Sequence, residues 1–184
     1  FKCDWSSDVC SSDLMSLHKT LPALTQTALL HVCNPSIVKR GRIEEYLNVF
    51  ETSSPSYVLM ASIVSCLQFI VNDSGEYLTN LSKMLDIFYD EMKCLKNIKV
   101  EGYEEAFAKD KSKVVVKINE ELQGQFTGSW LMKELRERYN IEMEMAAISY
   151  VIGMFTVADD DEAFLRFSNA LKQIDQFMSE IVDK

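Results

Sequence analysis

The chain has 184 residues, of which 47% are hydrophobic and 26% are charged, a composition typical of a folded protein with one or two small domains. Its formal net charge is -9 and its lysines and arginines form no dense cluster, which argues against broad binding to nucleic acid or to an anionic membrane. The longest apolar stretch, residues 57–71, is interrupted by polar residues and falls short of the roughly 20 apolar residues that a membrane span needs. It predicts a buried helix of a soluble protein. No secretory signal is recognisable, so the cytoplasm is the expected compartment.

The first 14 residues are treated separately. Residues 4–14 read DWSSDVCSSDL and resemble the translation of a common sequencing-adapter oligonucleotide. Residues 1–14 are therefore predicted to be non-native, and the chain to be a fragment whose natural sequence begins near Met15 or was cut there. The cysteines outside this segment lie far apart and show no CxxC spacing, which predicts buried free thiols at Cys33, Cys66 and Cys94 rather than a metal site or a disulfide framework.

The first half of the chain predicts a mainly helical region. A polar turn is expected first, followed by a short buried strand, an amphipathic helix, a mostly apolar helix and a long amphipathic helix. These elements are predicted at residues 16–22, 28–32, 37–50, 57–71 and 76–95. Hydroxyl residues before Pro55 predict the N-cap and first turn of the apolar helix.

The second half predicts a small α/β layer. A β-branched run at residues 113–118 predicts a strand, and Thr127-Gly128 opens a helix that runs to about Tyr139. Two short strands are expected within residues 142–155. Acidic residues from Asp159 place negative charge at the positive end of a final helix over residues 162–181. The boundary between the two halves is predicted near residue 98.

Residues 16–28, SLHKTLPALTQTA, are the most informative segment. They resemble the fold-type-I pyridoxal-phosphate decarboxylases that act on ornithine, lysine or arginine, whose Schiff-base lysine lies in an S-x-H-K context followed by T-L-P-A-L-T. The resemblance implies that Lys19 is the catalytic residue that forms the Schiff base with pyridoxal 5'-phosphate. It also implies that Ser16 and His18 donate hydrogen bonds to the cofactor phosphate. The alternative interpretations are a solvated turn lysine, a packed or capping histidine and a turn hydroxyl.

Two further segments resemble the same family. Residues 51–57, ETSSPSY, match a T-S-P-x-Y segment, and the resemblance implies that Thr52 and Ser53 reach the phosphate bound by a partner subunit; helix capping explains them equally well. Residues 110–116 and 127–131 match a strand, a T-G turn and a W-L helix, with structural roles only. The resemblance extends over roughly residues 15–175. It departs from the family at Val64, where relatives often have an acidic residue.

The resemblance implies an α/β fold class: the C-terminal part of the large domain of a fold-type-I pyridoxal-phosphate-dependent transferase at residues 15–98, followed by a small α/β C-terminal domain at residues 99–184. It implies decarboxylation of a basic amino acid by a homodimer or higher homo-oligomer, with the cofactor ring as electron sink and without a metal. The alternatives are another fold-type-I enzyme, such as an aminotransferase, and a non-catalytic truncated chain. In such enzymes the ring-stacking residue, the phosphate loop and the aspartate that pairs with the pyridine nitrogen all precede the lysine. Because the segment before Met15 is too short to hold them, this chain alone is expected to be inactive.

Overall fold

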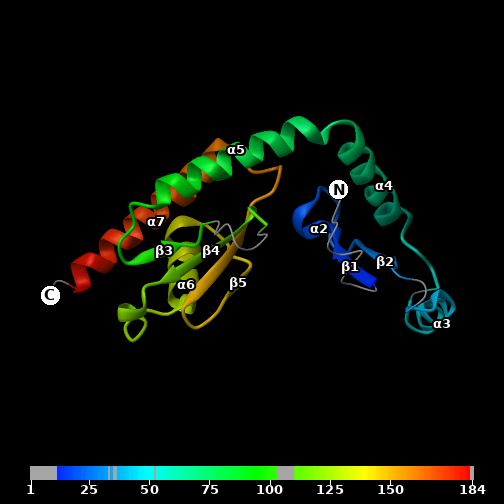
Figure 1. Ribbon diagram of the computed structural model, residues 1–184, viewed down its shortest axis with the longest axis horizontal. Coiled ribbons are helices and arrows are strands. Elements are labelled where there is room, and N and C mark those ends of the chain that lie inside the picture. Colours follow the sequence, from blue (N-terminus) through cyan, green and yellow to red (C-terminus); the bar gives the residue numbers. More distant parts are fainter. Residues whose placement is uncertain (1–11, 33, 35–36, 52, 103–109, 183–184) are drawn as a thin grey trace. The chain divides into compact units, whose positions relative to one another are not determined.

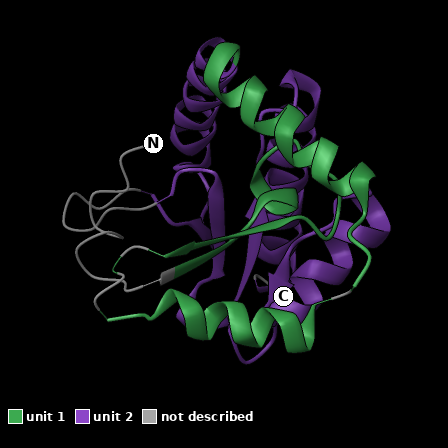
Figure 2. Cartoon of the chain, turned by 90° about the vertical axis from the view of Figure 1, so that its right-hand side faces the viewer, with its two compact units in different colours: residues 1–73 green, residues 74–184 purple. Residues whose placement is uncertain are grey.

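The computed structural model describes residues 12–32, 34, 37–51, 53–102 and 110–182. It divides into two compact units, residues 1–73 and residues 74–184 (Figure 2). The division falls before the boundary predicted near residue 98. The reason is that helix α5 packs on helix α7 and strand β3, both of which belong to the second unit.

The first unit contains a two-stranded sheet and three helices (Figure 1). In chain order these are β1 (Ser12–Ser16), α2 (Leu17–Thr20), β2 (Ala28–Val32), α3 (Arg40–Phe50) and α4 (Tyr57–Asn72). β1 and β2 pair antiparallel, with Ser16 opposite Ala28. The predicted bounds of β2, α3 and α4 are confirmed within a few residues, but the prediction that β2 is buried is wrong, because all five of its residues are exposed or half-buried. The predicted polar turn contains the helical turn α2 instead, and β1 includes residues 12–14 of the segment that was left out of the fold prediction.

Helices α3 and α4 expose most of their apolar side chains. α3 has no buried residue, and Phe50 is 82% exposed. In α4 only Cys66 is buried, while Tyr57 is 79% and Val71 is 81% exposed. The prediction of a buried α4 is therefore wrong for this chain, because the small first unit offers too little apolar surface to cover a helix of this hydropathy.

Helix α4 is capped by a different residue from those predicted. The side-chain oxygen of Ser56 accepts a hydrogen bond from the backbone N–H of Leu59, with a nitrogen–oxygen distance of 3.4 Å. The hydroxyl that caps the helix thus follows Pro55, whereas the prediction placed it before the proline. Ser53, one of the residues whose alternative role was capping, lies outside the helix.

The second unit contains a four-stranded antiparallel sheet and its helices. In chain order the elements are α5 (Ser74–Met92), β3 (Ile98–Val100), β4 (Lys113–Ile118), the 3-10 turn η1 (Glu120–Leu122), α6 (Gly128–Tyr139), β5 (Met145–Ala146), β6 (Tyr150–Met154) and α7 (Asp161–Val182). The strand order is β3-β4-β6-β5. The sequence predicted every one of these helices, together with β4 and the β5–β6 pair. The short edge strand β3 was not predicted.

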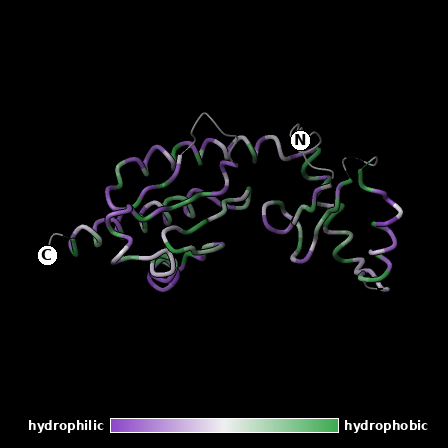
Figure 3. Tube along the Cα trace, turned by 60° about the horizontal axis from the view of Figure 1, so that its bottom comes forward, coloured by the Kyte–Doolittle hydropathy of each residue, from purple (hydrophilic) through white to green (hydrophobic). Residues whose placement is uncertain are grey.

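One face of this sheet carries the hydrophobic core. In β4 the side chains of Val114, Val116 and Ile118 are at most 1% exposed, whereas Lys113 and Lys117 point to the other face. Hydrophobic and hydrophilic residues alternate along the covering helices (Figure 3). The α-helix side chains that complete the core are Leu85, Phe88, Tyr89, Met92, Leu131, Leu135, Phe164, Phe167, Ala170, Leu171, Ile174 and Met178.

The start of α6 explains two of the predicted structural residues. The side chain of Thr127 caps the helix by accepting from the backbone N–H of Trp130 at 3.1 Å. A Cβ atom at Gly128 would lie 2.3 Å from the backbone oxygens of both Ala147 and Tyr150, so only glycine fits there. The prediction that Thr127-Gly128 opens a helix is confirmed.

The cysteines differ from one another in exposure. Cys66 is 1% exposed, and burial raises the pKa of its thiol. Cys94 is exposed, and its Sγ donates to the backbone oxygen of Glu91 at 3.1 Å, so the prediction of burial is wrong there. Cys33 lies outside the described residues.

Within the described ranges no single helix is both long and apolar enough to cross a membrane. By length and composition, α4 and α5 would suffice only as a bent pair, since the chain breaks between them.

Candidate functional site

The predicted catalytic lysine lies in the connection between two paired strands. β1 ends at Ser16 and β2 begins at Ala28, and the four-residue helix α2 fills the start of the loop between them. The side chain of Leu17 is 1% exposed and anchors this turn, whereas Lys19 is exposed. A buried leucine therefore holds the turn, and Lys19 lies on its exposed side.

The ring of His18 is fixed from the opposite end of the same loop. Its Nδ1 lies 3.0 Å from the backbone oxygen of Thr27, and the backbone N–H of Leu17 donates to that oxygen at 3.1 Å. A carbonyl oxygen only accepts hydrogen bonds, so Nδ1 must carry the proton. In the neutral ring, Nε2 is then the acceptor, and His18 can donate to a phosphate through Nε2 only in its protonated form.

Thr27 is itself held by hydrogen bonds. It is 2% exposed, and its hydroxyl donates to the backbone oxygen of Leu24 at 2.7 Å. The preceding residue, Gln26, has a φ of 76°, a left-handed conformation that is uncommon for any residue with a side chain. The backbone N–H of Leu24 donates in turn to the hydroxyl oxygen of Ser62 on α4, at 2.8 Å.

The other predicted phosphate ligands occupy different positions in the first unit. Ser16 precedes α2 as its N-cap residue and is half-buried, and no side-chain capping hydrogen bond is formed there. Ser53 is exposed in the link between α3 and α4. Thr52 lies outside the described residues. The structure thus groups Ser16, His18 and Lys19 in one turn, and their roles remain predictions.

The chemistry of this group fits pyridoxal 5'-phosphate. A primary amine that can condense with an aldehyde, at Lys19, lies on the same turn as a hydroxyl and an imidazole that can donate to a phosphate. In the part of the chain that the structure describes, no group of three His, Cys, Asp or Glu side chains could hold a metal ion. The amine, hydroxyl and imidazole of the turn suit a cofactor that is bound through an amine and through hydrogen bonds.

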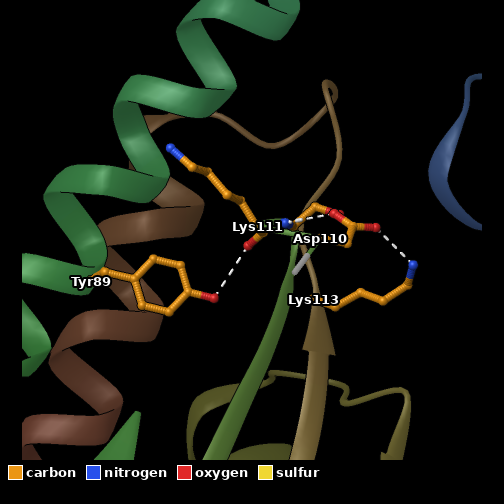
Figure 4. Close-up of polar contacts among 5 residues, drawn as sticks. Tyr89, Asp110, Lys111 and Lys113 are labelled. Atoms are coloured by element: carbon orange, nitrogen blue, oxygen red, sulfur yellow. Dashed lines mark hydrogen bonds and ion pairs between the residues drawn. The ribbon is translucent and has the colours of Figure 1, made fainter. Parts of the chain in front are cut away.

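The second unit has a separate polar cluster at the start of β4 (Figure 4). Burial raises the pKa of the Asp110 carboxyl, but hydrogen bonds from Lys113 and Ser112 outweigh burial, so that its pKa lies below the ordinary value. The Oδ2 atom of Asp110 lies 2.7 Å from Nζ of Lys113, and the hydroxyl of Tyr89 donates to the backbone oxygen of Lys111 at 3.2 Å. These contacts fix the entry to a strand and connect it to α5, which is a structural role.

Comparison with known proteins relates the chain to a family of enzymes. The family model described as Orn/Lys/Arg decarboxylase, major domain, matches residues 6–121. An arginine decarboxylase of Bacillus subtilis (strain 168) is 26% identical over 170 residues, which cover 90% of this chain and 34% of the relative. The chain spans about a third of the length of the arginine decarboxylases it matches.

Two solved structures share the fold. A lysine decarboxylase of Francisella novicida superposes with a TM-score of 0.72 at 13% identity, covering 92% of this chain and 28% of that one. The constitutive lysine decarboxylase of E. coli gives a TM-score of 0.65 at 19% identity, covering 90% and 28%. The chain is thus a mixed α/β protein with the fold of a part of these decarboxylases. It belongs to the Orn/Lys/Arg decarboxylase family.

Two residues that support the lysine turn were not predicted. Thr27 acts through a backbone oxygen, and any residue type supplies such an oxygen. Ser62 is a small polar residue within an apolar helix, where serine often faces solvent or bonds to its own helix. The sequence offers one sign of a role for Thr27: this hydroxyl residue directly precedes the predicted strand at residues 28–32.

Proposed function

We propose that the intact protein is a pyridoxal-phosphate-dependent decarboxylase of a basic amino acid, namely arginine, lysine or ornithine, in which Lys19 carries the cofactor. The observation that supports this most strongly is the position of Lys19, an exposed residue on a turn anchored by a buried leucine, in a chain that belongs to the Orn/Lys/Arg decarboxylase family. Relatives named arginine decarboxylase and structural neighbours named lysine decarboxylase support the substrate class.

Each residue of the turn has a separate role in this proposal. The primary amine of Lys19 would hold the cofactor covalently through its aldehyde group. When bound, the cofactor supplies the electron sink for loss of the substrate carboxylate as carbon dioxide. The amine of Lys19, once exchanged for that of the substrate, returns a proton to the substrate carbon. Ser16 and protonated His18 donate hydrogen bonds to the phosphate.

The proposal extends to the assembly. Thr52 and Ser53 are proposed to reach the phosphate held by a partner subunit, which requires a homodimer or a higher homo-oligomer. Sedimentation of the intact enzyme should show at least a dimer. Each subunit would complete its partner's site. In a mixed dimer of a Ser53→Ala subunit and a Lys19→Ala subunit, one site would therefore receive native Lys19 from the first subunit and native Ser53 from the second. Such a mixture should regain activity. A fully active monomer would contradict this part.

The exposed helices of the first unit support a larger enzyme. α3 has no buried residue and α4 has one, yet both carry many apolar side chains, and apolar faces of this kind are normally covered. We infer that further polypeptide of the intact enzyme covers them, and that the 184 residues alone are inactive. Hydrogen exchange should be slower in α4 of the intact enzyme than in α4 of this chain alone. Equal exchange rates would argue against the covering.

Chemical labelling tests the assignment of the lysine. Borohydride reduction of the intact enzyme with its cofactor should attach a pyridoxyl group to the peptide that contains Lys19. Lys19→Ala should abolish this label, whereas Lys39→Ala, at another exposed lysine of the same unit, should keep it. Release of carbon dioxide without a keto acid from arginine, lysine or ornithine would separate decarboxylation from transamination. A pyridoxyl label on another residue would refute the role of Lys19.

A further inference from the structure

We propose that Thr27 and Ser62 are positioning residues that hold His18 in its Nδ1–H tautomer and fix the turn carrying Lys19. Neither residue belongs to the predicted cofactor-binding set. The consequence for the cofactor depends on the proposed function, but the effect on His18 does not.

The first step concerns one backbone oxygen. The carbonyl of Thr27 accepts from the backbone N–H of Leu17 at 3.1 Å and from Nδ1 of His18 at 3.0 Å. One atom therefore orients both the start of α2 and the ring beside Lys19. A shift of this carbonyl would release the ring and the turn together.

The second step explains what holds that carbonyl in place. The hydroxyl of Thr27 donates to the oxygen of Leu24 at 2.7 Å, and its backbone N–H donates to the same oxygen at 3.3 Å. The left-handed conformation of Gln26, with a φ of 76°, lets the chain close this tight turn. The Thr27 side chain is buried, and a buried hydroxyl without a hydrogen bond costs free energy. The closed turn is favoured because it gives this hydroxyl its acceptor, the oxygen of Leu24.

The third step connects the turn to a helix. The hydroxyl oxygen of Ser62 on α4 accepts from the backbone N–H of Leu24 at 2.8 Å. The peptide groups and side chains thus form a series of hydrogen bonds from Ser62 through Leu24 and Thr27 to His18. These bonds act on the position of the backbone at Leu24 and Thr27, and so on the carbonyl that His18 contacts.

The series has a chemical consequence at His18. Because Nδ1 keeps its proton, a neutral His18 presents a lone pair at Nε2, and a protonated one presents an N–H there. If the series breaks, the neutral ring can exchange between its two tautomers. Thr27 and Ser62 thereby determine which group of His18 is available to a phosphate, without being catalytic residues themselves.

The test measures the tautomer directly, with no cofactor present. The 184-residue chain has two histidines, His18 and His31, so long-range proton–nitrogen NMR spectra of histidine-labelled protein resolve both. A His31→Gln variant assigns the signals. At a pH where the rings are neutral, wild-type His18 should show the Nδ1–H pattern. Thr27→Val and Ser62→Ala should each lose that pattern partly or wholly in favour of Nε2–H.

Matched controls separate positioning from a general effect of the substitution. Thr25→Val makes the same change two residues from Thr27, at an exposed side chain, and Ser65→Ala does so at an exposed serine of α4. Both should leave the His18 pattern unchanged. Should Thr27→Val fail to fold, Ser62→Ala still decides the question, because Ser62 is less buried.

Two results would overturn the proposal: an Nε2–H pattern in wild-type His18, or an unchanged Nδ1–H pattern in both variants. In the intact enzyme, Thr27→Val should raise the Kd of pyridoxal phosphate by about three- to tenfold, while the Thr25→Val value stays near wild type. A pyridoxyl label away from Lys19, with the Nδ1–H pattern intact, would refute the proposed function and leave the positioning of His18 standing.

Discussion

The carboxylate oxygen Oδ1 of Asp175 lies 2.7 Å from the backbone nitrogen of Asn97, a residue 78 positions earlier in the chain. The backbone N–H groups of Lys96 and Ile98 donate to the same carboxylate at 3.1 and 3.0 Å. Asp175 is 7% exposed within α7, so a buried acidic side chain fixes the start of β3 from a distant helix. These bonds satisfy a buried carboxylate, and they order the backbone that leads into β3.

Replacing Asp175 should destabilise the second unit. In Asp175→Ala three backbone donors lose a charged acceptor, and we expect the free energy of unfolding to fall by about 2 to 3 kcal/mol. Urea unfolding followed by circular dichroism measures the change. Gln176→Ala, at the next and exposed position of α7, should stay within about 0.5 kcal/mol of wild type. Equal stability of the two variants would show that the carboxylate contributes nothing.

Gly128 and Gly75, which both lie in the first turn of a helix, should respond in opposite ways to alanine. In Gly128→Ala the new Cβ would lie 2.3 Å from two backbone oxygens, which cannot move aside as a flexible side chain can. We expect a loss of roughly 3 kcal/mol or more, or displacement of the β5–β6 connection. At Gly75 in α5 no atom lies within 4 Å of the added Cβ, so Gly75→Ala should stabilise the protein by about 0.5 to 1 kcal/mol. Thermal unfolding of both variants decides this, and a tolerated Gly128→Ala would contradict the packing described at α6.

Periodicity in the sequence was sufficient where an element buries one face within its own unit. The β-branched run from Lys113 to Ile118 predicted β4, and the spacing of Leu85, Phe88 and Met92 predicted α5. Side chains of both elements reach the core of the second unit. The same rule gave the right helix but the wrong burial for α4. Its apolar side chains have no surface to pack on in the first unit, and a hydropathy pattern does not reveal which surface is present.

The candidate site was predicted through the motif around Lys19, and the structure adds what the motif lacks. The apolar side chain of Leu17 is the kind of residue that a sequence shows as a candidate for burial. The hydrogen bond between His18 and Thr27, in contrast, depends on a backbone oxygen and on the φ of Gln26. Neither of these has a residue-type signature. Strand β3 was missed for a similar reason, since it is short and depends on bonds from Asp175, far away in the sequence.

The two described cysteines should differ strongly in reactivity. Burial at 1% exposure raises the pKa of the Cys66 thiol and blocks access to it, so iodoacetamide should leave it unmodified in the folded chain. Cys94 is exposed and should be alkylated. Site-resolved mass spectrometry after a short reaction at pH 7.5 to 8 measures both, and the same reaction in urea should modify Cys66 as well. Rapid native labelling of Cys66 would indicate that α4 opens or packs differently.

The ion pair at the start of β4 should make stability depend on pH in one direction. The pKa of Asp110 is lower in the folded protein than its ordinary value of about 4, so the folded state favours the charged carboxylate. Its contribution is fully present above about pH 4 and is lost as the pH falls through the folded pKa. Because both side chains of the pair with Lys113 are about half exposed, solvent screening limits it to less than about 1 kcal/mol.

The Asp110→Asn variant isolates this contribution, since its remaining side-chain oxygen can still accept from Ser112. Wild type should exceed the variant in free energy of unfolding at pH 6, and the difference should shrink towards zero at pH 3, because protonation removes the charge that the variant lacks. Asp90→Asn serves as the control, since Asp90 pairs with Lys93 at the same spacing on a more exposed surface. Urea titrations of all three proteins at both pH values provide the comparison. An Asp110→Asn deficit that is equally large at pH 3 and pH 6 would show that the hydrogen-bond geometry, and not the charge, supports the strand.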